Sequence, residues 1–217
     1  MNWPILSSLS EEDRRRVLAS TRRRKFARRE VLFHEGDLGD TLHLIDKGRL
    51  AVRITTPLGD VATLSVLGAG DVVGEMAVIH ENGRRKATVM ALEPTETLSL
   101  QRDQFLELRR EHPAVDRFLI EVLAANLQMV NSHLMEALFV PVERRVLRRL
   151  LALTDVYGSP GNRSEIPLTQ DDLASLAGTS RATVNRVLRQ AEEAGWVALG
   201  RGKVKVLDAE RLARRAR

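Results

Sequence analysis

The stretch Pro113–Phe139, PAVDRFLIEVLAANLQMVNSHLMEALF, predicts how the rest of the chain is organised. It has few charges and no glycine or internal proline, as expected for one long helix. Apolar residues recur at alternating steps of three and four, which places them in one seam along the helix: Ile120, Leu123, Leu127, Val130, Leu134 and Ala137. A second apolar set lies on a different face: Val115, Leu119, Val122 and Met129.

A helix that is apolar on two faces is buried on two faces. We therefore predict that the first seam pairs with the same seam of a second chain, and that the second packs on the preceding domain. At about 27 residues the helix would span roughly 40 Å, which is long for a monomer of this size. The alternative is an ordinary core helix of a monomer.

Composition excludes several classes of protein. A chain of 217 residues is one large domain or two small ones, and a hydrophobic content of 43% is enough for folded cores. The absence of cysteine excludes disulfides, thiol nucleophiles, and iron–sulfur or zinc sites held by cysteine. No secretion signal or membrane-spanning run is visible in the sequence, so we expect a cytoplasmic protein with no membrane partner.

The positive charge is concentrated in the last third of the chain. Residues 141–217 carry 15 Lys/Arg and 9 Asp/Glu, a net charge of +6, whereas residues 1–140 carry 19 and 20, a net charge of −1. A basic C-terminal segment is typical of a nucleic-acid-binding protein.

The N-terminal part reads as strands and turns. A helix is predicted over Ser10–Ala19, capped by Ser10, and the basic run after it either contacts phosphates or is a solvated face: Arg22, Arg23, Arg24, Lys25, Arg28 and Arg29. Short β-rich runs follow, separated by turn residues: Val31–Phe33, Leu42–Ile45, Leu50–Thr55, Val61–Leu67, Ala87–Leu92 and Thr97–Leu100. This spacing favours a small antiparallel barrel or sandwich. Arg102–Arg110 is predicted to be a short helix that leads into the long one.

One segment interrupts the strands. Gly74-Glu75-Met76-Ala77-Val78-Ile79 opens a single helical turn whose free backbone N–H groups suit a phosphate, and the basic cluster Arg84-Arg85-Lys86 follows about ten residues later. An arginine there can grip an anion with two parallel hydrogen bonds. The alternative is an ordinary glycine turn followed by a charged loop.

After the long helix, Pro141 predicts a hinge, and Val142–Tyr157 predicts an amphipathic helix with its four arginines mostly outward. An exposed loop is expected at residues 158–164. The next segment fits a helix-turn-helix: Thr169 caps the first helix, Gly178 forms the turn, and Ser180 caps the second. The second helix leaves one polar face outward: Arg181, Ala182, Asn185, Arg186 and Arg189. That face suits the major groove of DNA, and residues 195–207 predict a two-stranded wing.

From about Leu9 to Leu207 the order of these parts resembles the cyclic-AMP receptor protein and fumarate–nitrate regulator family of bacterial transcription factors. The most specific similarities are Gly74-Glu75-Met76-Ala77 with Arg85-Lys86-Ala87-Thr88-Val89, and Ser180-Arg181-Ala182-Thr183-Val184-Asn185-Arg186. The resemblance implies an α+β fold with three parts. Residues 1–112 are a β jelly-roll sensor domain, 113–140 a dimerisation helix and hinge, and 141–217 a winged helix-turn-helix.

The resemblance also implies a ligand site. In members that bind cyclic AMP, the residues at Glu75 and Arg85 hold the ribose 2′-hydroxyl and the phosphate. Lys86 stands where the family has Ser or Thr, which favours a ligand with more phosphate or a lysine that fills the site itself. Val130-Asn131 replaces the Thr–Ser pair that hydrogen-bonds adenine, and only Asn131 retains a hydrogen-bonding side chain. The ligand-binding candidates are Gly74, Glu75, Met76, Arg85, Lys86, Ala87, Val130 and Asn131.

For DNA, Arg181 and Arg186 match family positions whose arginines contact base edges. The residue after the first of these arginines is usually Glu, which accepts a hydrogen bond from a cytosine of the TGTGA half-site, and here it is Ala182. The DNA-binding candidates are Thr169, Gln170, Ser180, Arg181, Ala182, Thr183, Asn185, Arg186 and Arg189. We expect a palindromic double-stranded DNA site, a homodimer, and RNA polymerase as a further partner.

The leading hypothesis is therefore a homodimeric DNA-binding regulator that responds to a phosphate-bearing ligand. No cofactor is obligatory, and cyclic AMP or another cyclic nucleotide is the candidate effector. The alternative within this class is a ligand-independent regulator that is always in its DNA-binding form. No Ser/His/Asp or paired-carboxylate grouping indicates an enzyme, and His80 as a lone loop histidine does not indicate a haem or metal site. A third hypothesis is a nucleotide-sensing module whose C-terminal segment binds protein rather than DNA. The net charge of +6 in that segment and the arginines of its second helix argue against it.

Overall fold

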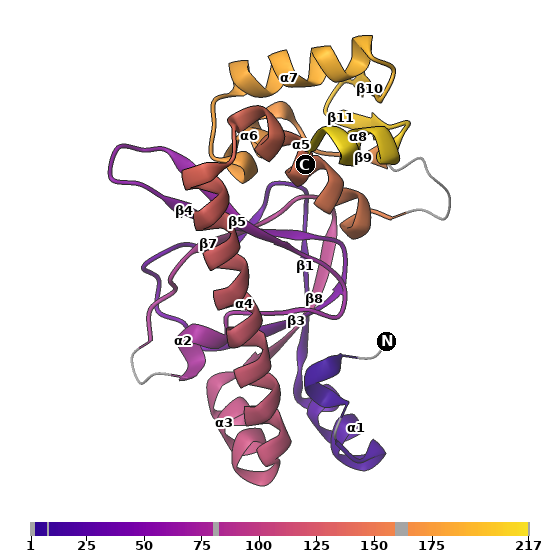
Figure 1. Ribbon diagram of the computed structural model, residues 1–217. Coiled ribbons are helices and arrows are strands. Elements are labelled where there is room, and N and C mark those ends of the chain that lie inside the picture. Colours follow the sequence, from indigo (N-terminus) through magenta and orange to yellow (C-terminus); the bar gives the residue numbers. More distant parts are fainter. Residues whose placement is uncertain (1–2, 8, 80–82, 159–164, 217) are drawn as a thin grey trace. The chain divides into compact units, whose positions relative to one another are not determined.

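Residues 3–7, 9–79, 83–158 and 165–216 are described in the computed structural model. Figure 1 shows their helices and strands in sequence order. The chain divides into two units, Met1–Thr55 with Leu64–Gln128 and Thr56–Thr63 with Met129–Arg217. His80 and residues 159–164 of the predicted loop lie outside the described residues. The long helix is present with the predicted bounds, α4 (Pro113–Phe139), and contributes to both units.

The first unit is built on two four-stranded sheets, with strand orders β1-β8-β3-β6 and β2-β7-β4-β5. The strands are β1 (Arg22–Phe26), β2 (Val31–Phe33), β3 (Thr41–Lys47), β4 (Leu50–Thr55), β5 (Val61–Leu67), β6 (Val72–Val73), β7 (Thr88–Ala91) and β8 (Thr95–Gln101). β3 pairs antiparallel with β8, and β4 with β7. The two sheets confirm the predicted β-roll and the α+β class, and the strands β2, β4 and β5 have the predicted bounds.

The sequence analysis did not predict strand β1. Its basic residues belong to the basic run and are exposed, as both a solvated face and a phosphate-contacting face require. Arg23 Nη1 lies 2.5 Å from Asp46 Oδ2 and 2.7 Å from Glu96 Oε2. The run forms a strand because its backbone pairs with β8, a partner far away in sequence, and the propensities of arginine and lysine do not indicate this pairing.

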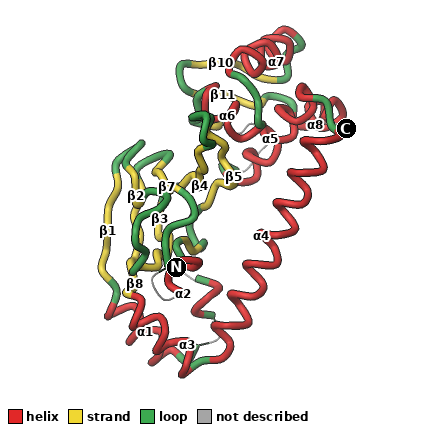
Figure 2. The backbone as a smooth tube through the Cα atoms, turned by 90° about the vertical axis from the view of Figure 1, so that its left-hand side faces the viewer, coloured by secondary structure: helices red, strands yellow, loops and turns green. Residues whose placement is uncertain are grey.

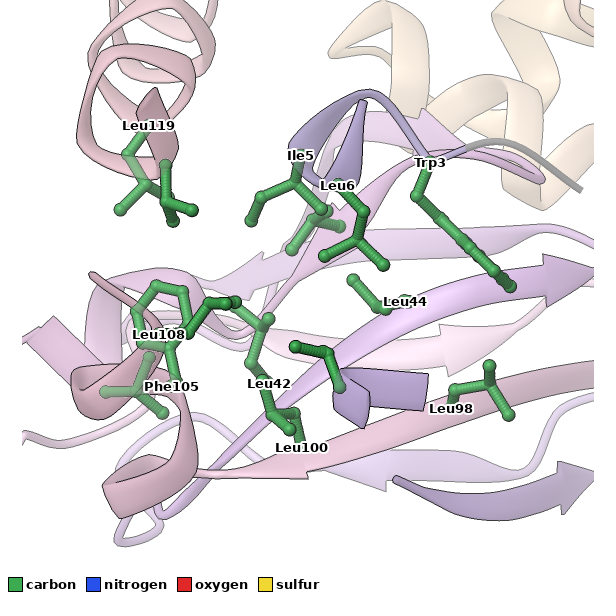
Figure 3. Close-up of a cluster of buried hydrophobic side chains, with 14 residues drawn as sticks. Trp3, Ile5, Leu6, Leu42, Leu44, Leu98, Leu100, Phe105, Leu108 and Leu119 are labelled. Carbon is green, nitrogen blue, oxygen red and sulfur yellow. The ribbon is translucent and has the colours of Figure 1, made fainter. Parts of the chain in front are cut away.

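Helices close the core of this unit. They are η1 (Pro4–Leu6), α1 (Glu11–Ser20), α2 (Glu75–Ile79), α3 (Arg102–Glu111) and the start of α4. Ser10 caps α1 as predicted. Figure 3 shows Phe105 and Leu108 of α3 at one side of a buried cluster that also contains leucines of β3 and β8, with Trp3 at the other side. The Trp3 indole donates to the Ile45 carbonyl at 2.9 Å. Val115 and Leu119 are buried in this cluster, so the first half of the second seam of α4 packs on the preceding domain as predicted. Val122 and Met129 of the same seam are only half-buried.

A buried histidine makes the stability of this unit dependent on pH. His43 is 5% exposed, and its Nδ1 lies 3.0 Å from Thr97 Oγ1. Burial, followed by the charges of Arg85 and Arg24, lowers the pKa of His43 from 6.5 to about 4. Between these values the unfolded chain binds a proton that the folded chain does not. Stability therefore falls as the pH falls through this window, by up to about 3 kcal/mol.

We expect His43→Gln to flatten the pH dependence between about pH 4 and 6.5 relative to the wild type. Urea unfolding at several pH values measures this, with exposed His34→Gln as the matched control, which should keep the wild-type dependence. A His43→Gln curve that runs parallel to the wild-type curve would contradict the assignment.

The second unit contains residues 56–63, with the first residues of β5, the end of α4 and all later elements. The later elements are α5 (Val142–Val156), β9 (Glu165–Ile166), α6 (Gln170–Ala177), α7 (Arg181–Glu193), β10 (Val197–Gly200), β11 (Lys203–Val206) and α8 (Ala209–Ala216). Strands β10 and β11 pair as the predicted two-stranded wing, and β9, which was not predicted, adds a third strand to their sheet beside β11. Figure 2 shows α7 and β10 next to each other in this unit. The sequence analysis did not predict helix α8.

The arginines of α5 do not lie mostly outward, and that prediction was wrong. Arg144 is exposed, whereas Arg145, Arg148 and Arg149 are half-buried. Arg148 Nη1 lies 3.1 Å from Glu136 Oε1, and Arg149 Nη2 lies 2.5 Å from Glu136 Oε2. Contacts with α6, α7 and α8 cover more of α5 than one apolar stripe indicates, and ion pairs make that burial possible.

Candidate functional sites

The ligand cassette begins at a glycine whose conformation no other residue adopts readily. Gly74 has φ +93°, and a Cβ at this position would lie 2.5 Å from Arg85 Nη1 and 2.9 Å from the Thr41 carbonyl oxygen. The lack of a side chain therefore allows the guanidinium of Arg85 to lie against the backbone at the start of α2. The cassette residues that the sequence singled out, Gly74 and Arg85, are brought together as predicted.

Arg85 is 4% exposed. Its Nη1 donates to the Gly74 carbonyl at 3.1 Å and its Nη2 to Thr41 Oγ1 at 2.9 Å. The guanidinium carbon lies 4.0 Å from the centre of the Phe33 ring. Nε has no hydrogen-bond partner within the described part of the chain. A buried guanidinium with an unused N–H is suited to receive an oxygen atom of an anion.

Glu75 lies beside this arginine and is 8% exposed. Burial raises the pKa of Glu75, while the backbone N–H groups of Glu75 and Gly74 and the charge of Arg85 act in the opposite direction. Burial likewise lowers the pKa of Arg85 against the charges of Asp40, Glu75 and Asp37. The site thus combines an anion-binding fork with a carboxyl group that can hydrogen-bond a hydroxyl.

Other predicted ligand residues are less enclosed. Met76 is 49% exposed, Lys86 is exposed and Ala87 is half-buried. The exposure of Lys86 argues against the interpretation in which it fills the site itself. Val130 and Asn131 are exposed residues of α4 in the second unit, and their contact with a ligand stays a prediction. The sequence analysis did not identify Phe33 and Thr41 as site residues, because only the fold shows that they contact the guanidinium of Arg85.

The helix-turn-helix has the predicted local structure. The Asp172 N–H donates to Thr169 Oγ1 at 3.2 Å, and the Thr183 N–H donates to Ser180 Oγ at 3.2 Å. These bonds cap α6 and α7. Gly178 ends α6 with φ 60°, the left-handed conformation expected of the turn. Local sequence signals therefore determine the bounds of both helices.

Helix α7 presents the predicted polar face. Val184, Val187 and Leu188 are buried, so the opposite side is free for the outward residues: Arg181, Ala182, Asn185, Arg186 and Arg189. Gln170 Nε2 donates to Asn185 Oδ1 at 3.4 Å, which joins α6 to this face. An exposed helix face of this composition fits the major groove.

The arginines of this face have acidic partners in the DNA-free chain. Arg186 Nη2 lies 2.8 Å from Glu143 Oε1, Arg181 Nη1 lies 3.6 Å from Asp171 Oδ2, and Arg189 Nη1 lies 2.9 Å from Glu192 Oε2. The hydrogen bond from Arg186 is the main cause that lowers the pKa of Glu143. Exposed ion pairs contribute little stability, so phosphates and bases can displace the carboxylates. The sequence analysis did not identify Glu143 as a partner of Arg186, because the two residues are 43 positions apart and lie in different helices.

Family models match both halves of the chain. The cyclic nucleotide-binding domain matches residues 23–112, and the Crp-like helix-turn-helix domain matches residues 144–215. The cyclic AMP receptor protein of Thermus thermophilus is 36% identical over 206 residues, which cover 95% of this chain and 93% of that protein. A CRP-like cAMP-activated global transcriptional regulator of Mycobacterium tuberculosis is 33% identical over 195 residues, 88% and 87% of the two chains.

Solved structures of similar proteins support the same family assignment and fold. The Thermus thermophilus catabolite activator protein is 35% identical, with a TM-score of 0.56 and coverage of 98% of both chains. The c-di-GMP responsive regulator CLP of Xanthomonas campestris shares the fold at 23% identity, with a TM-score of 0.76 and coverage of 92% of this chain and 99% of that chain.

A β-roll of the cyclic nucleotide-binding type followed by a Crp-like helix-turn-helix defines a DNA-binding transcription regulator, and not an enzyme. The chain belongs to the CRP/FNR family of these regulators. None of the helices in the described ranges is long and apolar enough to cross a membrane.

Proposed function

We propose that the protein is a homodimeric, sequence-specific transcription regulator controlled by a small phosphate-bearing ligand, with a cyclic nucleotide such as cyclic AMP as the first candidate. The observation that carries the ligand proposal is the buried fork of Arg85, with its unused Nε, next to the buried carboxyl of Glu75. Relatives that are named cyclic AMP receptor and cAMP-activated regulator support it.

In this proposal residues 1–112 sense the ligand, 113–140 dimerise, and 141–217 bind a palindromic DNA site. The dimer forms through Ile120, Leu123, Leu127, Val130, Leu134 and Ala137. All of these residues are exposed in the single chain, where large exposed apolar side chains indicate an interaction surface. The regulator acts in the cytoplasm and works through RNA polymerase.

A ligand-independent regulator is the second candidate, and one observation favours it. The two terminal nitrogens of Arg85 already donate to Gly74 and Thr41, and Phe33 covers the guanidinium. Val130 also replaces a residue that hydrogen-bonds adenine in relatives of the cyclic AMP type. In this case the chain binds DNA equally well with and without nucleotides.

Nucleotide screening by thermal shift and DNA binding by fluorescence anisotropy test both candidates. A ligand at about 100 times its Kd should add roughly 2.7 kcal/mol of stability and should increase DNA affinity. Affinity for DNA should fall steeply with salt, with log K decreasing by about 0.9 per phosphate contact for each log unit of salt. If no cyclic mono- or dinucleotide stabilises the protein and it still binds DNA, the ligand-independent form is correct.

The DNA sequence that is read should differ from the usual family site at one base pair. An arginine fork suits the O6 and N7 atoms of guanine, so we expect guanine opposite Arg181. Ala182 cannot accept a hydrogen bond from cytosine but can touch a thymine methyl, and the absence of that hydrogen bond removes about 1–3 kcal/mol of discrimination. Selection from a random library should yield half-sites about one helical turn apart, with relaxed or thymine-leaning choice opposite Ala182.

The control for this selection is Ala182→Glu, which restores the carboxylate and should restore cytosine readout. A strict cytosine requirement in the wild type that is unchanged in Ala182→Gly would show that another residue reads this base pair.

A further inference from the structure

Helix α8 follows the wing and is strongly amphipathic, with a buried apolar side and exposed arginines. Leu212 and Ala216 are buried, and Arg148 Nε donates to the Ala216 carbonyl at 2.8 Å, which fixes the end of α8 against α5. The arginines of the remaining surface, Arg211, Arg214 and Arg215, are exposed. Arg214 and Arg215 stabilise the helix C-terminus through its dipole, but this role does not require a third arginine in the first turn.

These arginines share a hollow with a tryptophan. Trp196, Arg211, Arg214 and Arg215 line an open hollow of about 300 Å³. Arg211 Nε lies 3.3 Å from Asp208 Oδ2 and Arg214 Nη2 lies 4.0 Å from Glu210 Oε2, both highly exposed pairs of the kind that contribute little. Arg215 forms no ion pair with a described residue, and the half-buried Trp196 indole N–H likewise donates to none of them.

The hollow lies close to the DNA-reading helix through Glu143. This carboxylate pairs with Arg186 of α7 at 2.8 Å, and its helix α5 packs against both α7 and α8. On the other side of the hollow, the Trp196 backbone N–H donates to the Ala191 carbonyl of α7 at 2.9 Å. The hollow is therefore next to the helix that holds Arg186. Because the phosphate chains of DNA border the groove that a recognition helix enters, a cation at this position faces phosphates when Arg186 faces bases.

We propose that Arg211, Arg214, Arg215 and Trp196 form an accessory surface for the DNA backbone beside each half-site. This inference rests on the proposed DNA binding and adds a second contact to it. Guanidinium forks match phosphate oxygens, and an indole N–H adds a hydrogen-bond donor. The contact carries no sequence information, so it increases affinity for DNA that extends beyond the palindrome.

The test compares the wild type with a full-length variant that carries Arg211→Gln, Arg214→Gln and Arg215→Gln. Glutamine and arginine have similar helix propensities, so α8 should persist, and circular dichroism checks this. Affinity is measured against salt on a duplex that ends at the palindrome and on a longer duplex with flanks. On the longer duplex we expect at least about tenfold weaker binding, and a salt slope reduced by about 0.9 for each phosphate that the variant no longer neutralises. Base preferences should not change.

The matched control removes the same charge from the first unit with Arg15→Gln, Arg16→Gln and Arg110→Gln, all exposed arginines of α1 and α3. It should keep the wild-type slope. Trp196→Phe keeps an aromatic ring but removes the donor, and should show a smaller decrease in affinity. Three results would overturn the inference: an unchanged slope in the α8 variant, an equal decrease in the control, or unchanged DNA binding with abolished transcription, which would indicate a protein partner. A wild type that binds no DNA would instead overturn the proposed function.

Discussion

Leu127→Asp should convert the protein from a dimer to a monomer at micromolar concentration and abolish tight binding to palindromic DNA. In the single chain Ile120 is 67% exposed, Leu127 is 62% exposed and Leu134 is 56% exposed. A dimer seam would bury each Leu127, and an aspartate there becomes an unpaired buried charge that costs several kcal/mol. A cost of about 4 kcal/mol raises the dimer dissociation constant by about a thousandfold. Sedimentation velocity and DNA anisotropy measure both effects.

Two variants make this experiment decisive. Ala125→Asp places the same charge on an exposed residue about 160° around the helix from Leu127, and it should leave the dimer intact. Leu127→Met conserves volume and should also remain dimeric. Circular dichroism should show that Leu127→Asp stays folded, because Leu127 contributes little to the core of the single chain. A Leu127→Asp protein that sediments as a dimer and binds DNA would show that the seam is assigned wrongly.

Arg85→Ala should remove the nucleotide-induced gain in thermal stability and weaken nucleotide affinity by at least about 100-fold. The substitution deletes the buried guanidinium, including the Nε that has no partner in the described chain, and leaves Glu75 without its neighbouring positive charge. Hydrogen bonds to charged groups contribute about 1.5–3 kcal/mol each, and a fork makes two of them. Isothermal titration calorimetry with the ligand found by thermal shift measures the decrease in affinity.

Neighbouring arginines provide the control for this variant. Arg84 is exposed and donates to the Gly36 carbonyl at 2.7 Å, so Arg84→Ala should bind as the wild type does. Arg85→Lys keeps the charge but not the fork and should bind with intermediate affinity. A folding defect in Arg85→Ala would weaken its binding, but it would not explain intermediate affinity in Arg85→Lys together with wild-type affinity in Arg84→Ala. Unchanged binding of every nucleotide by Arg85→Ala would place the ligand elsewhere.

The sequence by itself determined the elements whose signals are local. Ser10, Thr169 and Ser180 cap helices where their side chains meet the third following N–H, and Gly178 ends α6. The bounds of α4 follow from an uninterrupted apolar periodicity, and the outward face of α7 follows from the helical period. Such patterns depend on residues a few positions apart, so they can be read without knowledge of the fold.

Tertiary structure alone decided which distant residues meet. Phe33 and Thr41 reach Arg85 only because β2, β3 and the cassette fold together, and Glu143 reaches Arg186 only because α5 packs against α7. Strand β1 was not predicted because its backbone pairs with β8, which is far away in sequence. The arginines of α5 were misjudged because a charged side chain is expected in solvent until an acidic partner from another element, such as Glu136, makes its burial favourable. Sequence spacing does not encode these pairings, because they form between elements that only folding brings together.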